Sequence, residues 1–555
     1  MAYPFDLGCY SRAVSKKGAA QRWFDRGLAW CYGYNHDEAV RCFQRAAKAD
    51  PHCLMAQWGV AYASGPNYNK QWKAFDVLDL EASLRRARKA TLKAQKLAAK
   101  ASAVERDLAQ ALLERYPDDR VDQVTPIWND NYAAAMRAVY QAHQGDLDVA
   151  ALFAEAIMNR TPWALWDIST GKPAEGADTP EAISVLERAM GQPGGMSHPG
   201  ILHMYIHLME MSPNPERALR AADALRGLVP DAGHLQHMPT HIDVLCGEYP
   251  DVVTWNGHAM VADRKYVKAR GGLNFYSLYR CHNAHFQVYG AMFAGQQAIA
   301  MAAAEELEAM LTPELLRVES PPMADWLEAF VPIKQHVMIR FGKWQAIKDQ
   351  PLPKDQVLFS TTTAMIHYAK AVAYAATGEV AKAEAEAEAE AFQTARALVP
   401  ESRYLFNNTA IDILGIAAEM MAGEIAYRKA DHDAAFAHLR RAVELDDTLP
   451  YDEPWGWMQP ARHALGALLL EQGQVDEAAA VYRADLGLDA TLRRPCQHPD
   501  NVWSLHGLHE TLTKPNQIAQ ARLIKQRLDI AKARADVPIE ASCFCHQRAM
   551  SACCT

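Results

Sequence analysis

Residues 22–51 read RWFDRGLAWCYGYNHDEAVRCFQRAAKADP, and this stretch decides the fold class. Two helix-forming segments flank a short Gly/Asn-containing break, and a proline follows the second segment. Apolar residues recur three and four positions apart in both segments, which is the period of an amphipathic helix. Small residues at Gly27 and Ala39 allow two helices to approach closely, and Trp23 and Phe43 provide bulk to fill the contact. The stretch therefore predicts an antiparallel helix pair.

The same spacing is typical of the tetratricopeptide (TPR) repeat, in which Trp, Gly, Ala, Phe and Pro recur at fixed positions of a helix–turn–helix unit. Further segments keep a glycine, alanine or aromatic residue in register: 199–232, 233–266, 281–314, a truncated unit at 328–350, 459–492, and a last unit from 500. Stacked units of this kind bury a continuous core. The sequence therefore predicts an all-α fold, a right-handed superhelical solenoid of TPR-like helix pairs with long inserted loops.

We expect one TPR-like domain over residues 1–555. Its predicted parts are N-terminal repeats (1–120), histidine-rich central repeats (121–350), C-terminal repeats (351–540) and a Cys-rich tail (541–555). Pro-, Gly- and Trp-bearing stretches at 119–131 and 161–180 predict ordered connections, and residues 449–460 predict a loop before a repeat helix. The Ala/Glu-rich stretch 379–398 predicts a solvated helix.

Composition excludes several classes of partner. The chain has 66 acidic and 57 basic residues, a net charge of -9, with no basic tail that would indicate nucleic-acid binding. The N-terminus lacks the apolar core of a signal peptide, and no run of 18 apolar residues predicts a membrane span. We therefore expect a cytoplasmic protein that contacts neither nucleic acid nor membrane.

Ten of the 21 histidines lie between residues 198 and 336. The stretch HPGILHMYIHLMEMSPNPERALRAADALRGLVPDAGHLQHMPTHIDVLCG (198–247) contains most of them. His203, His207 and Glu210 are spaced to share one helix face, and His234, His237 and His241 are spaced to share a face of the next helix. His198 precedes the first helix and is expected to cap it.

Imidazoles on neighbouring helices can meet at one ion, because adjacent helices pack about 8–10 Å apart. Neutral imidazole suits zinc, copper, iron and nickel. The sequence therefore predicts a transition-metal site, with copper or iron favoured and zinc or manganese as alternatives. The candidate ligands, some of which would form a second site, are His203, His207, Glu210, His234, His237, His241, His282, His285 and His336. The competing interpretations are a metal-free polar network for an anionic or aromatic ligand, and a protein-recognition groove.

Four residues are predicted to take part in chemistry beside the metal: Glu210, Tyr289, Arg462 and His463. Arg462 and His463 follow the Trp-rich loop and would hold an anionic group of a substrate. The tail carries Cys543, Cys545, His546, Cys553 and Cys554, whose thiols would bind Cu(I) or zinc or act as a redox pair. The favoured interpretation is nevertheless a disordered or weakly ordered tail.

Five further motifs resemble a family of large TPR-like proteins that includes tetratricopeptide repeat protein 38 and bacterial TPR-repeat homologues. They are WGVAYASGPNYN (58–69), HPGILHMYIHLMEMS (198–212), GHLQHMPTHIDVLCGEY (233–249), YDEPWGWMQPARHALGALL (451–469) and NVWSLHGLHE (501–510). The resemblance spans nearly the full length. It implies an α-solenoid and does not decide the activity.

Our leading hypothesis from sequence is a metal-dependent enzyme, an oxidoreductase or oxygenase acting on a small organic substrate. Histidine-dominated sites with open positions suit copper and non-haem iron, which favours redox chemistry over hydrolysis. The alternatives are a TPR adaptor that binds a peptide or protein partner, a metal-dependent hydrolase and a metal-storage protein. A homodimer is a further expectation.

Overall fold

The computed structural model describes residues 3–379, 384–513 and 518–545. The helices pack into two compact units. The first comprises residues 1–242 and 258–276, and the second comprises residues 243–257 and 277–555. Each is described by itself below, and the predicted single domain over the whole chain stays a prediction.

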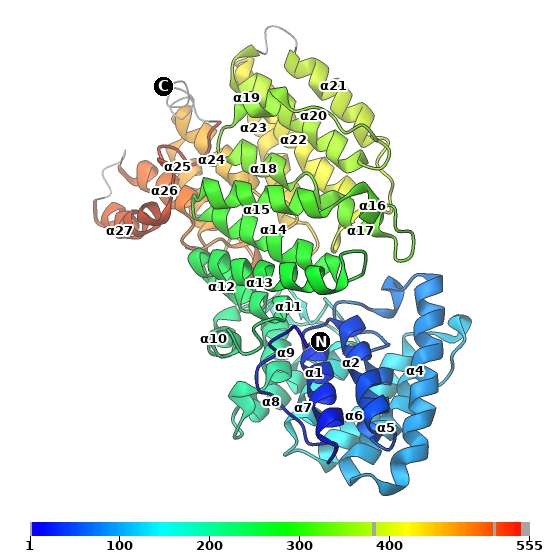
Figure 1. Cartoon of the computed structure of the whole chain (residues 1–555). Helices are drawn as coiled ribbons and strands as arrows, with labels where there is room; N and C mark the ends of the chain where they lie inside the picture. Colours follow the sequence, from blue (N-terminus) through cyan, green and yellow to red (C-terminus); the bar gives the residue numbers. More distant parts are fainter. Residues whose placement is uncertain (1–2, 380–383, 514–517, 546–555) are drawn as a thin grey trace. The chain divides into compact units, whose positions relative to one another are not determined.

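Helices account for almost all regular structure in the described residues (Figure 1). The first thirteen helices are α1 Gly18–Tyr32, α2 His36–Ala49, α3 Leu54–Tyr62, α4 Val77–Leu97, α5 Ala103–Arg115, α6 Ile127–Ala142, α7 Leu147–Met158, α8 Thr179–Met190, α9 Pro199–Met209, α10 Leu219–Leu225, α11 Gly233–His237, α12 Pro239–Cys246 and α13 Tyr249–Arg270. The remainder are α14 Ser277–Phe293, α15 Gln297–Met310, α16 Pro313–Leu316, α17 Met323–Leu327, α18 Ile333–Arg340, α19 Trp344–Asp349, α20 Ser360–Ala376, α21 Glu384–Arg396, α22 Ala410–Arg428, α23 His432–Asp447, α24 Ala461–Glu471, α25 Val475–Asp485, α26 Val502–Thr513 and α27 Ile518–Arg534. Two short antiparallel hairpins join β1 (Trp166–Asp167) to β2 (Lys172–Pro173) and β3 (Tyr404–Leu405) to β4 (Asn408–Thr409).

Consecutive helices pack as pairs, and Phe43 shows how the sequence produces this. A Cβ added at Gly27 of α1 would lie 2.6 Å from the Phe43 ring, and one added at Gly59 of α3 would lie 2.5 Å from it. The Phe43 ring of α2 therefore fills a space that exists because both neighbouring helices have glycine at the contact. Phe43 is fully buried. The predicted pair at residues 22–51 is confirmed, and its aromatic residue also joins it to the next helix.

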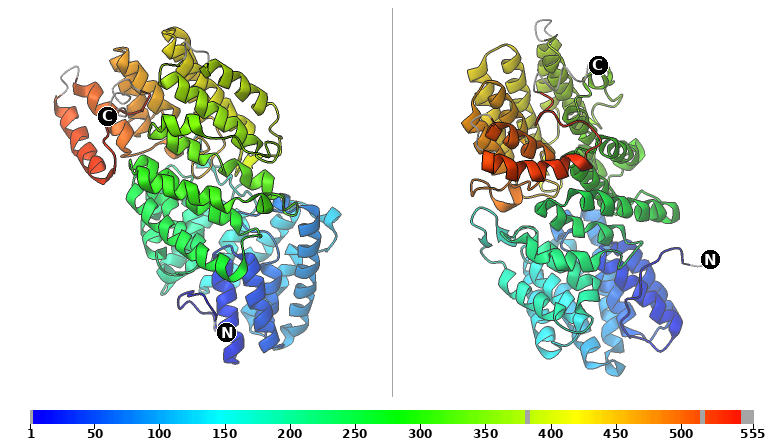
Figure 2. Two further views of the ribbon diagram at one scale, coloured as in Figure 1. Left: turned by 45° about the horizontal axis from the view of Figure 1, so that its top comes forward. Right: turned by 90° about the vertical axis from the view of Figure 1, so that its left-hand side faces the viewer.

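Tyr482 of α25 repeats this arrangement in the second unit. A Cβ at Gly466 of α24 would lie 2.6 Å from the Tyr482 ring, and one at Gly507 of α26 would lie 2.2 Å from it. Consecutive helices such as α22 and α23 lie side by side (Figure 1). The two turned views show that the chain consists almost entirely of helices (Figure 2). The predicted fold class, an all-α solenoid of TPR-like helix pairs, is confirmed.

Substituting Gly507 with valine tests this packing. We expect the variant to lose about 1–3 kcal/mol of unfolding free energy, because the new side chain must displace the Tyr482 ring in a filled core. The control is Gly145→Val, since nothing lies within 4 Å of a Cβ at Gly145. Urea denaturation of both variants measures the difference, and equal stability would show that the glycine is not required for the close approach.

Local departures from the sequence predictions have identifiable causes. Residues 127–131 belong to α6 and not to a connection, because Pro126 directly precedes the helix, where its missing N–H costs nothing. The connection 161–180 contains the β1–β2 hairpin and the start of α8. The loop before α24 is confirmed. In the stretch 379–398, the structure describes residue 379 and α21, and residues 380–383 lie outside the described residues.

None of the helices in the described ranges combines the length and the apolar character that a bilayer span requires.

Candidate metal centre

Helix α9 positions the first group of histidines. His198 precedes it and caps it, because its Nδ1 accepts a hydrogen bond from the backbone N–H of Ile201 (3.2 Å). Pro199 follows at the first helical position, which suits its fixed φ and missing N–H. His203 and His207 then lie one turn apart, and Glu210 follows the last helical residue. The hydrogen bond from Ile201 confirms the predicted cap. His203 contacts His207, and His207 is hydrogen-bonded to Glu210, so the three buried side chains lie together.

The second group of histidines is spread over two short helices, where the sequence analysis expected one. Helix α11 ends at His237 and α12 begins at Pro239. A proline at this position has no N–H to continue the ladder of α11, so the chain starts a new helix there. His234 and His237 therefore belong to α11, and His241 belongs to α12. The prediction of a single helical stripe was wrong in this respect.

The structure brings His203, His207 and His234 together. One ring nitrogen from each lies within 4.8 Å of one ring nitrogen of the others. The ring centroids are 4.7 Å apart for His203 and His207 and 4.9 Å apart for His203 and His234. Ligand nitrogens sit about 2.0–2.1 Å from a first-row ion, so small rotations of these side chains would bring all three to one ion. We call these three residues the imidazole cluster.

Hydrogen bonds define which nitrogen of each α9 histidine is available to a ligand. His203 Nδ1–H donates to the carbonyl oxygen of Tyr32 (2.6 Å), and His207 Nδ1–H donates to Glu210 Oε1 (3.0 Å). Both acceptors lack hydrogen, so the proton of each neutral ring is on Nδ1 and the lone pair is on Nε2. These two Nε2 atoms are buried and have no hydrogen-bond partner within the described residues.

Electrostatics keep both rings neutral at physiological pH. Burial, with a further contribution from neighbouring His207, holds the pKa of His203 well below its usual value. Burial lowers the pKa of His207 to about 3. Metal binding requires the neutral imidazole, because a protonated ring has no lone pair to donate. Both histidines are therefore in the form that coordinates a metal.

Glu210 connects the imidazole cluster to a second pair of histidines. Its other oxygen, Oε2, accepts a hydrogen bond from His241 Nδ1 (2.8 Å). His241 Nε2 lies 2.7 Å from His237 Nε2 and, with the His241 proton on Nδ1, accepts a hydrogen bond from it. A buried carboxylate that receives the Nδ1–H of a histidine fixes the orientation of the ring and raises its basicity. In this geometry Glu210 orients His207 and His241.

Aromatic side chains surround the imidazole cluster. The ring of Tyr34 stacks on His207 and on His234, with interplanar angles of 18° and 25°. Tyr68 and Trp163 pack on His207, with centroid distances of 4.9 and 5.9 Å. From the sequence, Tyr68 belongs to a family motif and is a candidate for the groove, whereas Tyr34 and Trp163 were not predicted. Both have a positive φ, 55° and 60°, a conformation that the sequence did not reveal.

The remaining predicted residues belong to the second unit, where three of them form hydrogen-bonded pairs. Arg462 makes a bidentate ion pair with Asp447 through both of its terminal nitrogens. Tyr289 Oη lies 3.0 Å from His498 Nε2. These side chains are engaged with protein groups in the described structure, so their predicted role toward a substrate stays a prediction.

His463 is held between a cation and an anion. Its Nδ1 accepts from Arg340 (2.8 Å) and its Nε2 donates to Asp485 Oδ2 (3.0 Å). Burial lowers the pKa of His463 to about 4, against the opposing charge of Asp485. Asp485 also accepts from His498, Asn501 and Ser504, at 2.8, 2.9 and 2.5 Å. We call Asp485 and its four donors the Asp485 network.

Of the other predicted ligands, His282 packs edge-on against Phe286 and Phe406, with centroid distances of 5.2 and 4.8 Å. His285 and His336 are both buried, and burial lowers the pKa of each to about 3.

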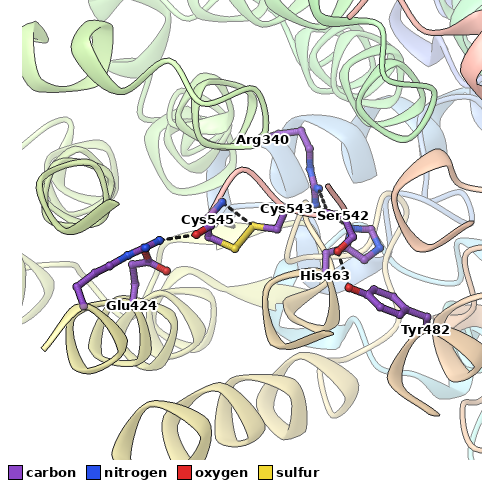
Figure 3. The surroundings of a disulfide bond; sticks show 8 residues. Arg340, Glu424, His463, Tyr482, Ser542, Cys543 and Cys545 are labelled. Carbon is purple, nitrogen blue, oxygen red and sulfur yellow. Dashed lines mark hydrogen bonds and ion pairs between the residues drawn. A yellow bond between two sulfur atoms is a disulfide. The ribbon is translucent and has the colours of Figure 1, made fainter. Parts of the chain in front are cut away.

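The start of the Cys-rich tail is ordered in the second unit. Cys543 and Cys545 form a disulfide (Figure 3). The carbonyl of Ser542 accepts from Arg340, and its hydroxyl pairs with Tyr482, so the segment is anchored beside His463. These contacts involve residues 542–545, and the predicted redox, metal-binding or weakly ordered character of the tail stays a prediction. His546, Cys553 and Cys554 lie outside the described residues.

Comparisons with known proteins complete this picture. No protein-family model matches the sequence, and no curated protein matches it significantly. Among solved structures, the chain is similar to one titled "Structure of Naa15/Naa10 bound to HypK-THB", with 13% identity, 93% of this chain and 70% of that chain covered, and a TM-score of 0.22. It is also similar to "Crystal structure of APC/C hetero-tetramer Cut9-Hcn1", with 13% identity, 97% of each chain covered and a TM-score of 0.24. At these TM-scores neither likeness carries a functional argument.

Proposed function

We propose that this protein is a TPR-like helical scaffold that binds a transition metal in its first unit, through Nε2 of His203 and His207 and a ring nitrogen of His234. One observation carries the proposal. Two buried, neutral imidazoles have unpartnered Nε2 atoms, while their Nδ1–H groups are fixed by a carbonyl and a carboxylate, and one ring nitrogen of each lies within 4.8 Å of the other and of one in His234. A buried acceptor without a donor costs about 1–3 kcal/mol. A metal ion bound by these nitrogens would offset this cost for both rings.

The ligand set favours particular ions. Three imidazoles suit zinc, copper, iron and nickel, whereas manganese prefers oxygen ligands. Copper and iron agree with the redox activity predicted from sequence. However, the three ligands are 0% exposed. Closed sites are typical of structural metals, and catalytic metals keep an open position. The geometry therefore supports metal binding, and the oxidoreductase or hydrolase activity rests on the sequence argument alone.

Metal content tests the proposal directly. We expect plasma mass spectrometry of the full chain, after dialysis against each of copper, iron, zinc and manganese, to find about one tightly held equivalent of at least one ion. The double variant His203→Ala with His207→Ala should lose it. The control, His52→Ala, changes an exposed histidine of the same unit. Circular dichroism verifies that both variants fold. A folded wild-type chain that refuses all four ions would refute the proposal.

A protein-binding adaptor is the second candidate, and the fold supports it more directly than it supports an enzyme. The helices pack closely where Phe43 contacts Gly27 and Gly59. TPR-like proteins as a class bind peptide segments on scaffolds of such stacked helix pairs. The two candidates are compatible, since a structural metal would stiffen such a scaffold. If the chain forms a stoichiometric complex with a purified partner equally well with and without metal, binding of partners is the function and the ion is structural.

A further inference from the structure

A second cluster of buried ligand atoms lies in the other unit and contains a sulfur. His285 Nε2 of α14 faces the Sδ atom of Met458 at 2.7 Å. Met458 belongs to the loop before α24, and the amide of its neighbour Gln459 donates to the carbonyl oxygen of His336 in α18 (2.7 Å). That bond ties the methionine-bearing loop to the helix that carries His336. Three segments far apart in the sequence therefore converge at this point.

Several polar atoms of this cluster have no hydrogen-bond partner within the described residues. They are Nδ1 of His285, Nδ1 of His336 and Nε1 of Trp457. His285 is 0% exposed, Met458 1% and His336 3%. The indole of Trp457 meets the His336 ring edge to face, with centroids 4.7 Å apart. A hydrogen-bonded structural core would normally satisfy such atoms. The two histidine rings and the thioether that contacts His285 are ligand types that bind a soft cation.

We propose that His285, Met458 and His336 form a binding site for a soft monovalent cation, Cu(I). A thioether selects Cu(I) over harder ions, and neutral imidazole is compatible with it. The ligand set carries no negative charge and is buried. The cost of burying an ion grows with the square of its charge, so a monovalent ion is favoured over a divalent one. The positive charge of Arg340, which adds to the effect of burial in lowering the pKa of His336, also repels a divalent ion more than a monovalent one.

This inference is independent of the metal proposed for the first unit. It concerns other residues, another ligand type and another class of ion. The sequence analysis included His285 and His336 among its candidate ligands. It had no means of adding Met458, because the methionine is 173 residues from His285 in the chain.

The experiment follows the methyl group of Met458 by NMR in full-length protein labelled with ¹³C at the methionine methyl groups. Accessible thiols are first alkylated with iodoacetamide, because free cysteines also bind soft ions. Ag(I), a redox-inert substitute for Cu(I), is then titrated to one equivalent. The Met458 resonance is assigned by its absence in Met458→Leu, a change of similar volume. Met136→Leu, another fully buried methionine, serves as the matched control.

We expect the Met458 resonance to shift on addition of Ag(I), and the shift to be lost in His285→Gln. In Cu(I) competition with a chelator, Met458→Leu should weaken binding at least tenfold, while Met136→Leu leaves it unchanged. Divalent metal held by His203 and His207 should be the same in all four proteins, which separates this inference from the proposed function. Titration of the wild-type chain to saturation without a shift of the Met458 resonance would overturn it.

Discussion

Replacing Glu210 with alanine is expected to weaken divalent metal binding by about 10–100-fold. Its two carboxylate oxygens receive Nδ1–H from His207 and from His241. Without the carboxylate oxygens, the His207 proton can move from Nδ1 to Nε2. Nε2, the atom that would bind the metal, then carries a proton and has no lone pair to donate. The ring also loses the bond that fixes its orientation. The loss therefore occurs in metal affinity although Glu210 itself need not touch the ion.

Two comparison variants make this prediction specific. Glu210→Gln should have an intermediate effect, because the amide oxygen accepts one Nδ1–H while the amide NH2 group opposes the other. Glu175→Ala removes an exposed carboxylate from the same unit and should change nothing. Competition with a chromogenic chelator measures the three affinities. Equal affinities of wild type and Glu210→Ala would show that the carboxylate does not support the ligands.

Asp485→Ala is expected to destabilise the second unit by about 3–5 kcal/mol, the cost of breaking a buried charge network by removing one partner. The carboxylate is 0% exposed and accepts four hydrogen bonds. Its removal leaves four buried donors, on His463, His498, Asn501 and Ser504, without their acceptor. Asp476→Ala, an exposed change in the same helix, is the control. Urea denaturation at pH 7 measures both, and a loss below 1 kcal/mol for Asp485→Ala would contradict the account.

The Asp485 network also predicts a dependence on pH. Burial raises the pKa of Asp485, but its interactions with His463 and His498, including the hydrogen bonds that they donate, outweigh this and hold the pKa well below the ordinary value. The unfolded chain therefore binds the proton more readily than the folded chain. The stabilisation is complete above the unfolded pKa of about 3.9 and is lost as pH falls through the lower folded value. Asp485→Asn should lose less stability than wild type between pH 5 and pH 3. Equal slopes for the two proteins would contradict the lowered pKa.

The fold was largely predictable from sequence because repeat packing is local. Phe43 contacts glycines that lie within one repeat length on either side, and Tyr482 does the same. Spacing alone therefore identifies the helices and their partners. Pro239 could have predicted the break between α11 and α12. It was missed because the three histidines are spaced as on one continuous helix.

The candidate site was only partly predictable. Spacing placed His203 and His207 on one face of a helix, but it grouped His234 with His237 and His241, whereas the structure brings His234 to the first pair. It could not show which nitrogen of each ring is free, because that depends on the carbonyl of Tyr32, 171 residues from His203. Nor could it separate ligands from the residues that orient them, such as Glu210. Arg462 and His463 were predicted from their position after a loop, and their partners Asp447 and Asp485 became apparent only in the folded chain.

The most direct test of the central claim is X-ray absorption spectroscopy of the metal-loaded full chain. The account predicts a first coordination shell of nitrogen at about 2.0–2.1 Å for zinc, with the outer-shell scattering of about three imidazoles. The imidazole contribution should fall in His203→Ala loaded with the same ion. A shell dominated by oxygen or sulfur, or a spectrum unchanged by that substitution, would place the metal elsewhere and contradict the account.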